Sequence, residues 1–105
     1  MKLKLKYVYD FYNNGDITFS DIFEQSIDIL NVPQRFTLHD QEDASFIVSG
    51  PLKNHVGTYV TLTYPNKDII IIYSGASQEL VYDEYYSAMG DDNHNVYEGT
   101  VTLED

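Results

Sequence analysis

Hydrophobic and polar residues alternate with a period of two at the start of the chain. One face would carry the apolar and aromatic side chains, and the other would carry the charged ones: Leu3, Leu5, Tyr7, Tyr9 and Phe11 against Lys2, Lys4, Lys6 and Asp10. This alternation is typical of a strand with one buried face. The sequence "NNGD" that follows is typical of a tight turn, because asparagine and glycine tolerate positive φ. We therefore expect a strand over residues 3–11 and a turn over residues 13–16.

Helical spacing appears in the next segment, "TFSDIFEQSIDILNVP". Its apolar residues recur three and four positions apart: Phe19, Ile22, Phe23, Ile27 and Leu30. Thr18 or Ser20 could cap a helix here, and Pro33 lies just beyond its expected end. The pattern predicts a helix over residues 19–30.

A second segment, residues 77–89, has a less decisive period. Its apolar and aromatic positions also fit a helix: Val81, Tyr82, Tyr85, Tyr86 and Met89. Ser77 could cap this helix and Gly90 could end it. The abundance of tyrosine instead favours a strand. We expect a helix, with a strand as the alternative.

The middle and the end of the chain are rich in strand-forming residues. Short strands are expected over residues 35–38 and 45–50, separated by the polar cluster "HDQED", and a hairpin over residues 57–73 with its turn at residues 65–68. The four isoleucines at 69–72 do not alternate with polar residues, which predicts a central strand covered on both faces. "DDNHN" (91–95) is expected to be a turn, and "VYEGTVTLED" (96–105) a closing strand.

These elements predict the fold class. We expect a single α+β domain over residues 1–105, in which a curved, mostly antiparallel sheet is packed by one or two helices.

The charge balance restricts the partners. Seventeen Asp and Glu residues against six Lys and Arg give a net charge of −11. On this charge we expect no direct binding to nucleic acid or to an anionic membrane, because phosphates require cations, and a basic partner is favoured. The chain has no cysteine, and its longest apolar run, Ile69–Ile72, is too short to cross a bilayer. The N-terminus lacks the separate basic and apolar regions of a signal peptide, so we expect a cytoplasmic protein.

No catalytic or cofactor motif is apparent. His39, His55 and His94, even with Asp40, Glu42 or Asp92 nearby, match no compact metal-ligand spacing. The glycines form no phosphate-binding loop, and no serine lies in a nucleophile-elbow pattern. We expect a protein that is not an enzyme and that needs neither metal nor cofactor.

One acidic cluster lies on the expected first helix. Asp21, Glu24 and Asp28 would share its outer face, with successive members roughly one turn, or about 5 Å, apart. That spacing is comparable to the phosphate repeat along a nucleic-acid strand. No lysine or arginine lies four residues further on to neutralise these carboxylates. The alternative interpretation is an ordinary solvated helix face.

The second cluster lies in residues 68–105, a segment with nine carboxylates and no lysine or arginine. It mixes acidic residues with tyrosines: Glu79, Tyr82, Asp83, Glu84, Tyr85, Tyr86, Asp91 and Asp92. Such a mixture suits a protein interface, because tyrosine supplies rigid contact area and carboxylates bind arginine and lysine. The alternative places the tyrosines in the core and leaves the acids solvated.

A small, acidic, cysteine-free chain with such a surface resembles proteins that imitate nucleic acid. These include anti-restriction proteins, anti-CRISPR proteins and uracil-DNA glycosylase inhibitors, which phages and mobile elements encode. The resemblance is one of charge and size over the whole chain. It implies a non-enzymatic inhibitor that occupies the basic nucleic-acid channel of a host defence enzyme, such as a CRISPR effector or a restriction enzyme, in the host cytoplasm.

Two other functions are compatible with the same sequence. The chain could be an immunity or antitoxin protein that masks a basic nuclease toxin, because that task needs the same acidic surface. It could also be a small regulatory or structural protein whose acidic charge is incidental.

Overall fold

β-Strands are the only regular elements in the described part of the protein. The computed structural model describes residues 1–39 and 45–105, with only the backbone of Ala88, and within these residues it contains no helix. The eight strands are β1 (Lys2–Asn13), β2 (Asp16–Asp28), β3 (Gln34–Thr37), β4 (Ser45–Lys53), β5 (Thr58–Thr63), β6 (Ile69–Tyr73), β7 (Ser77–Ala88) and β8 (Asp91–Glu104).

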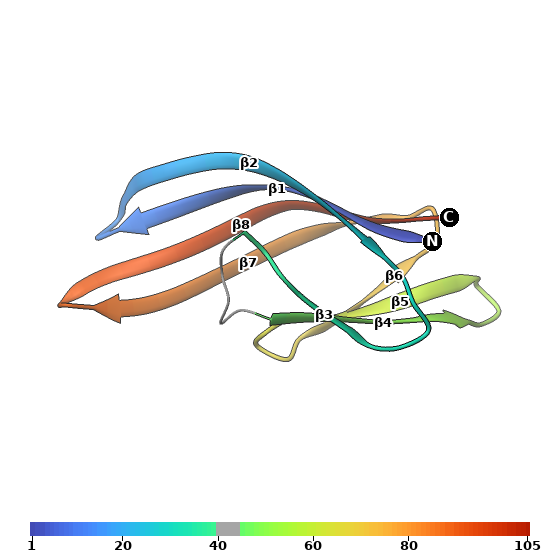
Figure 1. Ribbon diagram of the computed structural model, residues 1–105. Coiled ribbons are helices and arrows are strands. Elements are labelled where there is room, and N and C mark those ends of the chain that lie inside the picture. Colours follow the sequence, from blue (N-terminus) through green and yellow to red (C-terminus); the bar gives the residue numbers. More distant parts are fainter. Residues whose placement is uncertain (40–44) are drawn as a thin grey trace.

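The strands form two antiparallel four-stranded sheets that pack face to face (Figure 1). Sheet A has the order β2-β1-β8-β7, and sheet B has the order β3-β4-β5-β6. The last strand pairs with the first, with Lys2 opposite Glu104, so the two termini lie side by side. The chain therefore starts in sheet A, crosses to sheet B for four consecutive strands, and returns.

The core lies between the sheets and follows the two-residue alternation of each strand. Sheet A contributes Leu3, Leu5, Tyr7, Tyr9, Leu80, Tyr97, Val101 and Leu103, and sheet B with its flanking turns contributes Leu38, Phe46, Val48, Val60, Leu62, Tyr64 and Ile72. The rings of Tyr7 and Tyr97 meet edge to face, with centroids 5.7 Å apart. The predicted strand over residues 3–11 is thus confirmed as part of β1.

The predicted α+β class is wrong, and the error begins at residues 19–30. This segment lies mainly in β2, which pairs with β1 along its whole length, from Lys2–Asp28 to Asn13–Asp16. Phe23 and Ile27 face inward, whereas Ile22 and Leu30, which the helical pattern buried, are 62% and 57% exposed. β1 supplies hydrogen-bond partners for the backbone N–H and C=O groups of β2. This pairing decides the structure of the segment, although its apolar side chains have helical spacing.

The predicted helix over residues 77–89 is also wrong, because these residues form β7 apart from Met89. The alternative based on tyrosine content is the correct one. β7 pairs with β8 from Ser77–Thr102 to Ala88–Asp91, so "DDNHN" belongs to β8 and is not a turn. The turn lies at Met89 and Gly90, which have positive φ values of 54° and 83°.

Sheet B matches the predicted strands but not their arrangement. The strands near residues 35–38 and 45–50 and the hairpin over residues 57–73 are confirmed, with the hairpin turn after Tyr64. Of the cluster "HDQED", residues 40–43 lie outside the described residues. β6 is an edge strand and not a central one, and Ile69 and Ile71 are 62% and 45% exposed.

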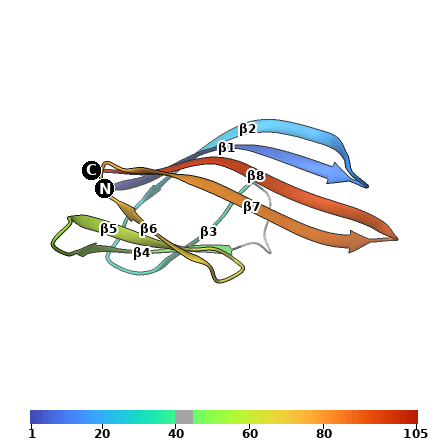
Figure 2. The same ribbon diagram turned by 180° about the vertical axis from the view of Figure 1, so that it is seen from behind.

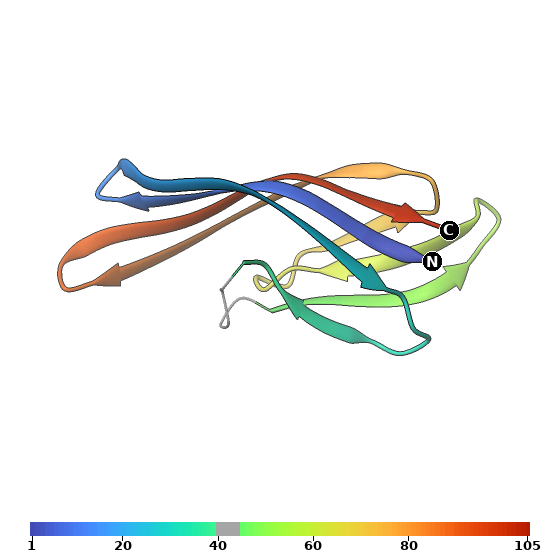
Figure 3. The ribbon, with the colours of Figure 1, turned by 45° about the horizontal axis from the view of Figure 1, so that its top comes forward.

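Sheet A is longer than sheet B and projects beyond it at one end (Figures 1 and 2). The molecule is accordingly elongated, with extents of 50 × 22 × 19 Å. The two projecting hairpins lie side by side and end in separate tips (Figure 3). The first is closed by Asn14 and Gly15, with φ values of 51° and 89°, the conformation of the two-residue turn that matches strand twist. In the described residues, no helix has the length and apolar character needed to cross a membrane.

Candidate functional site

The projecting half of sheet A carries much of the negative charge. We call residues 8–22 and 81–98 the acidic arm; they form the distal parts of β1, β2, β7 and β8 with their turns. The acidic arm holds eight carboxylates and no lysine or arginine: Asp10, Asp16, Asp21, Asp83, Glu84, Asp91, Asp92 and Glu98. Two segments about seventy residues apart in sequence are therefore joined into one anionic body, because β1 pairs with β8.

The outer face of the acidic arm alternates acidic with apolar positions. Strand register places Val8 beside Ile22 on one side and beside Glu98 on the other, with Val81 next to Glu98. The following rows contain Asp10, Val96 and Asp83, and then Tyr12, His94 and Tyr85. Ile22 is 62% exposed and Tyr85 is 56% exposed. This mixture of accessible apolar side chains and carboxylates is suited to contact with another protein.

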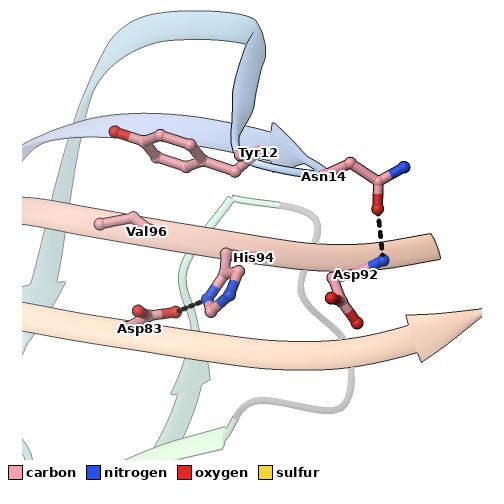
Figure 4. A pocket seen from close by; sticks show the side chains of 7 residues that line it. Tyr12, Asn14, Asp83, Asp92, His94 and Val96 are labelled. Atoms are coloured by element: carbon pink, nitrogen blue, oxygen red, sulfur yellow. Dashed lines mark hydrogen bonds and ion pairs between the residues drawn. The ribbon is translucent and has the colours of Figure 1, made fainter.

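A hydrogen-bond network fixes the end of the arm (Figure 4). Asn14 joins the two hairpins: its N–H donates to the Asp92 carbonyl over 2.7 Å, and its Oδ1 accepts from the Asp92 N–H over 2.9 Å. Its Nδ2 also lies 3.1 Å from Asp91 Oδ1. These contacts link the first turn to the start of β8, beside an open depression of about 600 Å³.

Three further side chains of the network lie on the outer face. His94 Nδ1 is 2.8 Å from Asp83 Oδ1, and the Tyr85 hydroxyl donates to Asp92 Oδ1 over 2.6 Å. The Tyr85 pKa is raised, mainly because this hydrogen bond to the Asp92 carboxylate is lost on deprotonation, and also because the carboxylate repels a phenolate. Although His94 and Asp83 form a pair of the kind used in nucleophilic catalysis, neither Ser, Thr nor Lys is among the residues that line the depression.

The inner face of the arm holds the other predicted residues. Glu84 lies beside Asn95, and its Oε2 is buried without a hydrogen-bond partner among the described residues. Tyr86 is 40% exposed, whereas Tyr82 packs against the rings of Phe46 and Tyr97, with centroids 5.5 and 6.3 Å away. Tyr82 therefore belongs mainly to the core, as the alternative interpretation of this cluster proposed.

The cluster predicted on the first helix is divided between two faces of β2. Asp21 shares the inner face with Phe23, whereas Glu24 and Asp28 lie on the outer face. Lysines of β1 neutralise both carboxylates. Glu24 Oε1 lies 3.8 Å from Lys6 Nζ, and Asp28 Oδ1 lies 4.0 Å from Lys2 Nζ. The predicted match between these carboxylates and the phosphate repeat assumed a spacing of one helical turn, so it does not apply to a strand.

The lysines define the other end of sheet A. Besides the two pairs above, Lys4 Nζ lies 3.0 Å from Glu104 Oε2. Glu79, on the outer face of β7, also belongs to this proximal part and lies outside the acidic arm. Sheet A is thus a strip with charge pairs at one end and unmixed negative charge at the other.

Comparison with known proteins adds no assignment. No protein-family model, curated protein or solved structure matches the chain.

A metal site has no support in residues 1–39 and 45–105, which contain no cluster of three potential ligand side chains. The three histidines lie in different environments. His39 stacks on Phe23, with ring centroids 3.9 Å apart, and His94 lies in a strand instead of the expected loop. His55 is exposed in the turn between β4 and β5, and Asp40 and Glu42, proposed as companions of His39, lie outside the described residues.

Several residues of the acidic arm were missed by sequence reasoning. Asp10, Asp16 and Glu98 were not grouped with the others, and neither were the exposed Ile22 and Val81. A signal existed: residues 7–34 contain no lysine or arginine, just as residues 68–105 contain none. Two cation-free segments in one acidic chain indicate one shared surface once they are recognised as paired hairpins.

Proposed function

We propose that this protein is a non-enzymatic inhibitor whose acidic arm occupies the basic nucleic-acid-binding surface of another protein. The partner class that fits best is a nucleic-acid-handling defence enzyme, such as a CRISPR effector or a restriction enzyme. The inhibitor acts in the cytoplasm, which is the host cytoplasm if a phage encodes it.

One observation carries this proposal: eight carboxylates and no lysine or arginine lie together on a projecting arm. A charge excess needed only for solubility has no reason to be confined in this way. The proximal part of sheet A mixes both signs, and so do residues 34–73, which carry three cations against four carboxylates. Unmixed negative charge on a narrow projection attracts and orients a basic cleft.

Apolar side chains on the same face supply the contact area that charge alone lacks. Ile22, Val81 and Tyr85 are 62%, 45% and 56% exposed, and all lie on the outer face of the arm. In the bound state the carboxylates bind lysines and arginines of the partner, and these side chains cover the centre of the contact. Occupation of the cleft excludes nucleic acid by direct competition.

Binding to a panel of purified proteins tests the proposal. The panel contains CRISPR effectors, restriction enzymes and nuclease toxins, with basic proteins that do not bind nucleic acid as controls. We expect binding to one nucleic-acid-handling class, competition by short duplex DNA, and an affinity that falls as salt is raised. Free duplex DNA should show no mobility shift with this protein at physiological salt.

Three outcomes would contradict the proposal. The first is binding that duplex DNA does not displace. The second is equal affinity for basic proteins that do not handle nucleic acid. The third is a mobility shift of free DNA. Selective binding to a nuclease toxin would assign the same surface to an immunity protein instead.

A further inference from the structure

The four edge strands differ in how they are protected against pairing with another chain. β2 carries four carboxylates and β7 carries three, while β3 has only four residues and includes Arg35. β6 has the sequence IIIIY and carries no charge or proline. Exposed edges normally avoid this composition, because unpaired N–H and C=O groups on an apolar strand are a template for a further strand.

The free side of β6 is defined by one contact. The carbonyl oxygen of Ile71 points away from β5, since it accepts a hydrogen bond from Gln78 Nε2. Antiparallel pairing alternates along a strand, so the backbone groups of Ile69, Ile71 and Tyr73 point away from β5. On this side the Tyr73 carbonyl accepts a hydrogen bond from the Ala76 N–H over 2.9 Å, whereas its N–H points to the open side. Their side chains lie on the outer face of sheet B, where Ile69 and Ile71 are 62% and 45% exposed.

The charge distribution selects what can cover this edge. Two chains of net charge −11 repel each other, and the acidic arm is where they repel most. Sheet B and its connections carry much less charge. Residues 34–73 include Arg35, Lys53 and Lys67 against Asp40, Glu42, Asp43 and Asp68, a balance of −1, compared with −8 in the acidic arm. A contact through β6 therefore brings two copies together at their least repulsive part.

We propose that the edge of β6 is a dimer interface, where it pairs antiparallel with β6 of a second copy. The register centred on Ile71 places Ile71 opposite Ile71 at the two-fold axis and Ile69 opposite Tyr73. In the outer pairs the Tyr73 N–H donates to the Ile69 carbonyl of the second copy, while the Tyr73 carbonyl keeps its bond to Ala76. The outer face then gains contiguous apolar pairs, which stabilise adjacent strands. Pairing requires the partly exposed Gln78 side chain to rotate aside, and the Ile71 carbonyl then accepts from the second strand in place of Gln78.

The dimer has a consequence for the arms. In the views of Figures 1 and 2 the arm extends roughly along the strands of sheet B. Antiparallel pairing reverses strand direction, so the two acidic arms project to opposite ends of the dimer. A five-residue edge is smaller than a standard interface, and we expect dissociation constants of roughly micromolar or weaker.

Sedimentation velocity tests the interface. Between about 5 and 500 µM the wild type should shift from monomer to dimer, and more readily at about 1 M salt, because screening reduces repulsion. Ile71→Lys should remain monomeric, since it places two ammonium groups at the axis. Val81→Lys is the matched control: Val81 is also 45% exposed on an edge strand, and it should dimerise like the wild type.

Disulfide trapping tests the register independently, because the chain contains no cysteine. Opposed residues of this kind of pair have Cα atoms about 5.5 Å apart, which a disulfide can span. Ile71→Cys should therefore form a covalent dimer under mild oxidation, whereas Ile69→Cys should not, because its copies lie two residues to either side of the axis. A wild type that sediments as a monomer throughout, or Ile71→Lys that dimerises normally, overturns the proposal. The edge would then be free for an extended segment of another protein.

Discussion

Replacing Gly99 by alanine should destabilise the protein severely, against the usual trend for this substitution. Gly99 lies in the middle of β8, opposite Tyr7 of β1. A Cβ at this position would lie 1.9 Å from the Lys6 carbonyl oxygen and 2.5 Å from the Tyr7 Cα. Ordinary contacts between such atoms are about 3.5 Å, so the two central strands would have to separate by more than about 1 Å.

The cost follows from what must move. Both contacts are with backbone, so no side-chain rotation relieves them, and separation of β1 from β8 breaks the centre of sheet A. Overpacking typically costs about 1–3 kcal/mol, and we expect about 3 kcal/mol or more here. In a domain of this size that lowers the melting temperature by roughly 12 °C or more.

Thermal unfolding followed by circular dichroism measures the effect. Thr100→Ala is the control, since Thr100 is the next residue and is exposed, and we expect it to cost less than about 1 kcal/mol. Where a glycine has room, alanine stabilises by about 0.4–1 kcal/mol through the unfolded state. A Gly99→Ala protein as stable as the wild type would therefore refute the close approach of β1 and β8.

Three further predictions concern the core and the surface. Burial raises the Tyr97 pKa far above its usual value near 10.0, so the folded state holds the phenol proton more tightly than the unfolded state does. The free energy of unfolding should therefore be constant below about pH 10 and fall above it. Part of the tyrosinate absorbance should appear only when the protein unfolds. Tyrosinate absorbance that is complete before the circular dichroism signal changes would contradict this. Phe46→Ala should lower the free energy of unfolding, measured in urea, by about 3–5 kcal/mol, because the ring is fully buried. Ile69 is exposed, so Ile69→Ala should cost less than about 1 kcal/mol. Equal losses would contradict the packing. Lys6→Ala should change the free energy of unfolding by less than about 0.5 kcal/mol, because the ion pair of Lys6 with Glu24 is exposed to solvent. A larger loss that vanishes in high salt would contradict this expectation.

The strands of the fold were predictable where one face alternates strictly. β1 was recognised because its inward residues are apolar and its outward ones are mostly lysine. β2 was not, for a specific reason. Phe19, Phe23 and Ile27 are four residues apart, and that spacing keeps them on one face in a helix and in a strand alike. Exposed Ile22 then tipped the pattern towards a helix.

The same ambiguity affected β7, and a different one affected β6. Tyr82 and Tyr86 share one face of β7, and Val81 and Tyr85 share the other, so both faces contain large side chains. Four consecutive isoleucines looked like a strand covered on both sides, yet Ile71 is exposed at an edge. Side-chain type does not reveal exposure when a protein leaves apolar residues on its surface.

The acidic surface was partly predictable from composition, and its shape was not. The excess of carboxylates after residue 68 is evident in the sequence. Which carboxylates are neutralised depends on which strands are neighbours. Glu24 and Asp28 face Lys6 and Lys2 of β1, although no cation is near them in sequence.

The central claim, that the acidic arm is the binding element, is tested most directly by two variants with the same change in charge. One reverses Asp16, Asp83 and Glu98 to lysine in the arm, and the other reverses Glu79, Glu104 and Asp105 to lysine outside it. Each changes three carboxylates into three cations, so the net charge rises by six, from −11 to −5. The measurement is the affinity of each variant for the partner found in the binding panel, by titration calorimetry at physiological salt. We predict that the arm variant loses about 100-fold or more, because attractive contacts become repulsive, and that the control stays within about threefold of the wild type. Equal losses in the two variants would mean that net charge alone governs binding, and an arm variant that binds at full strength would contradict the account.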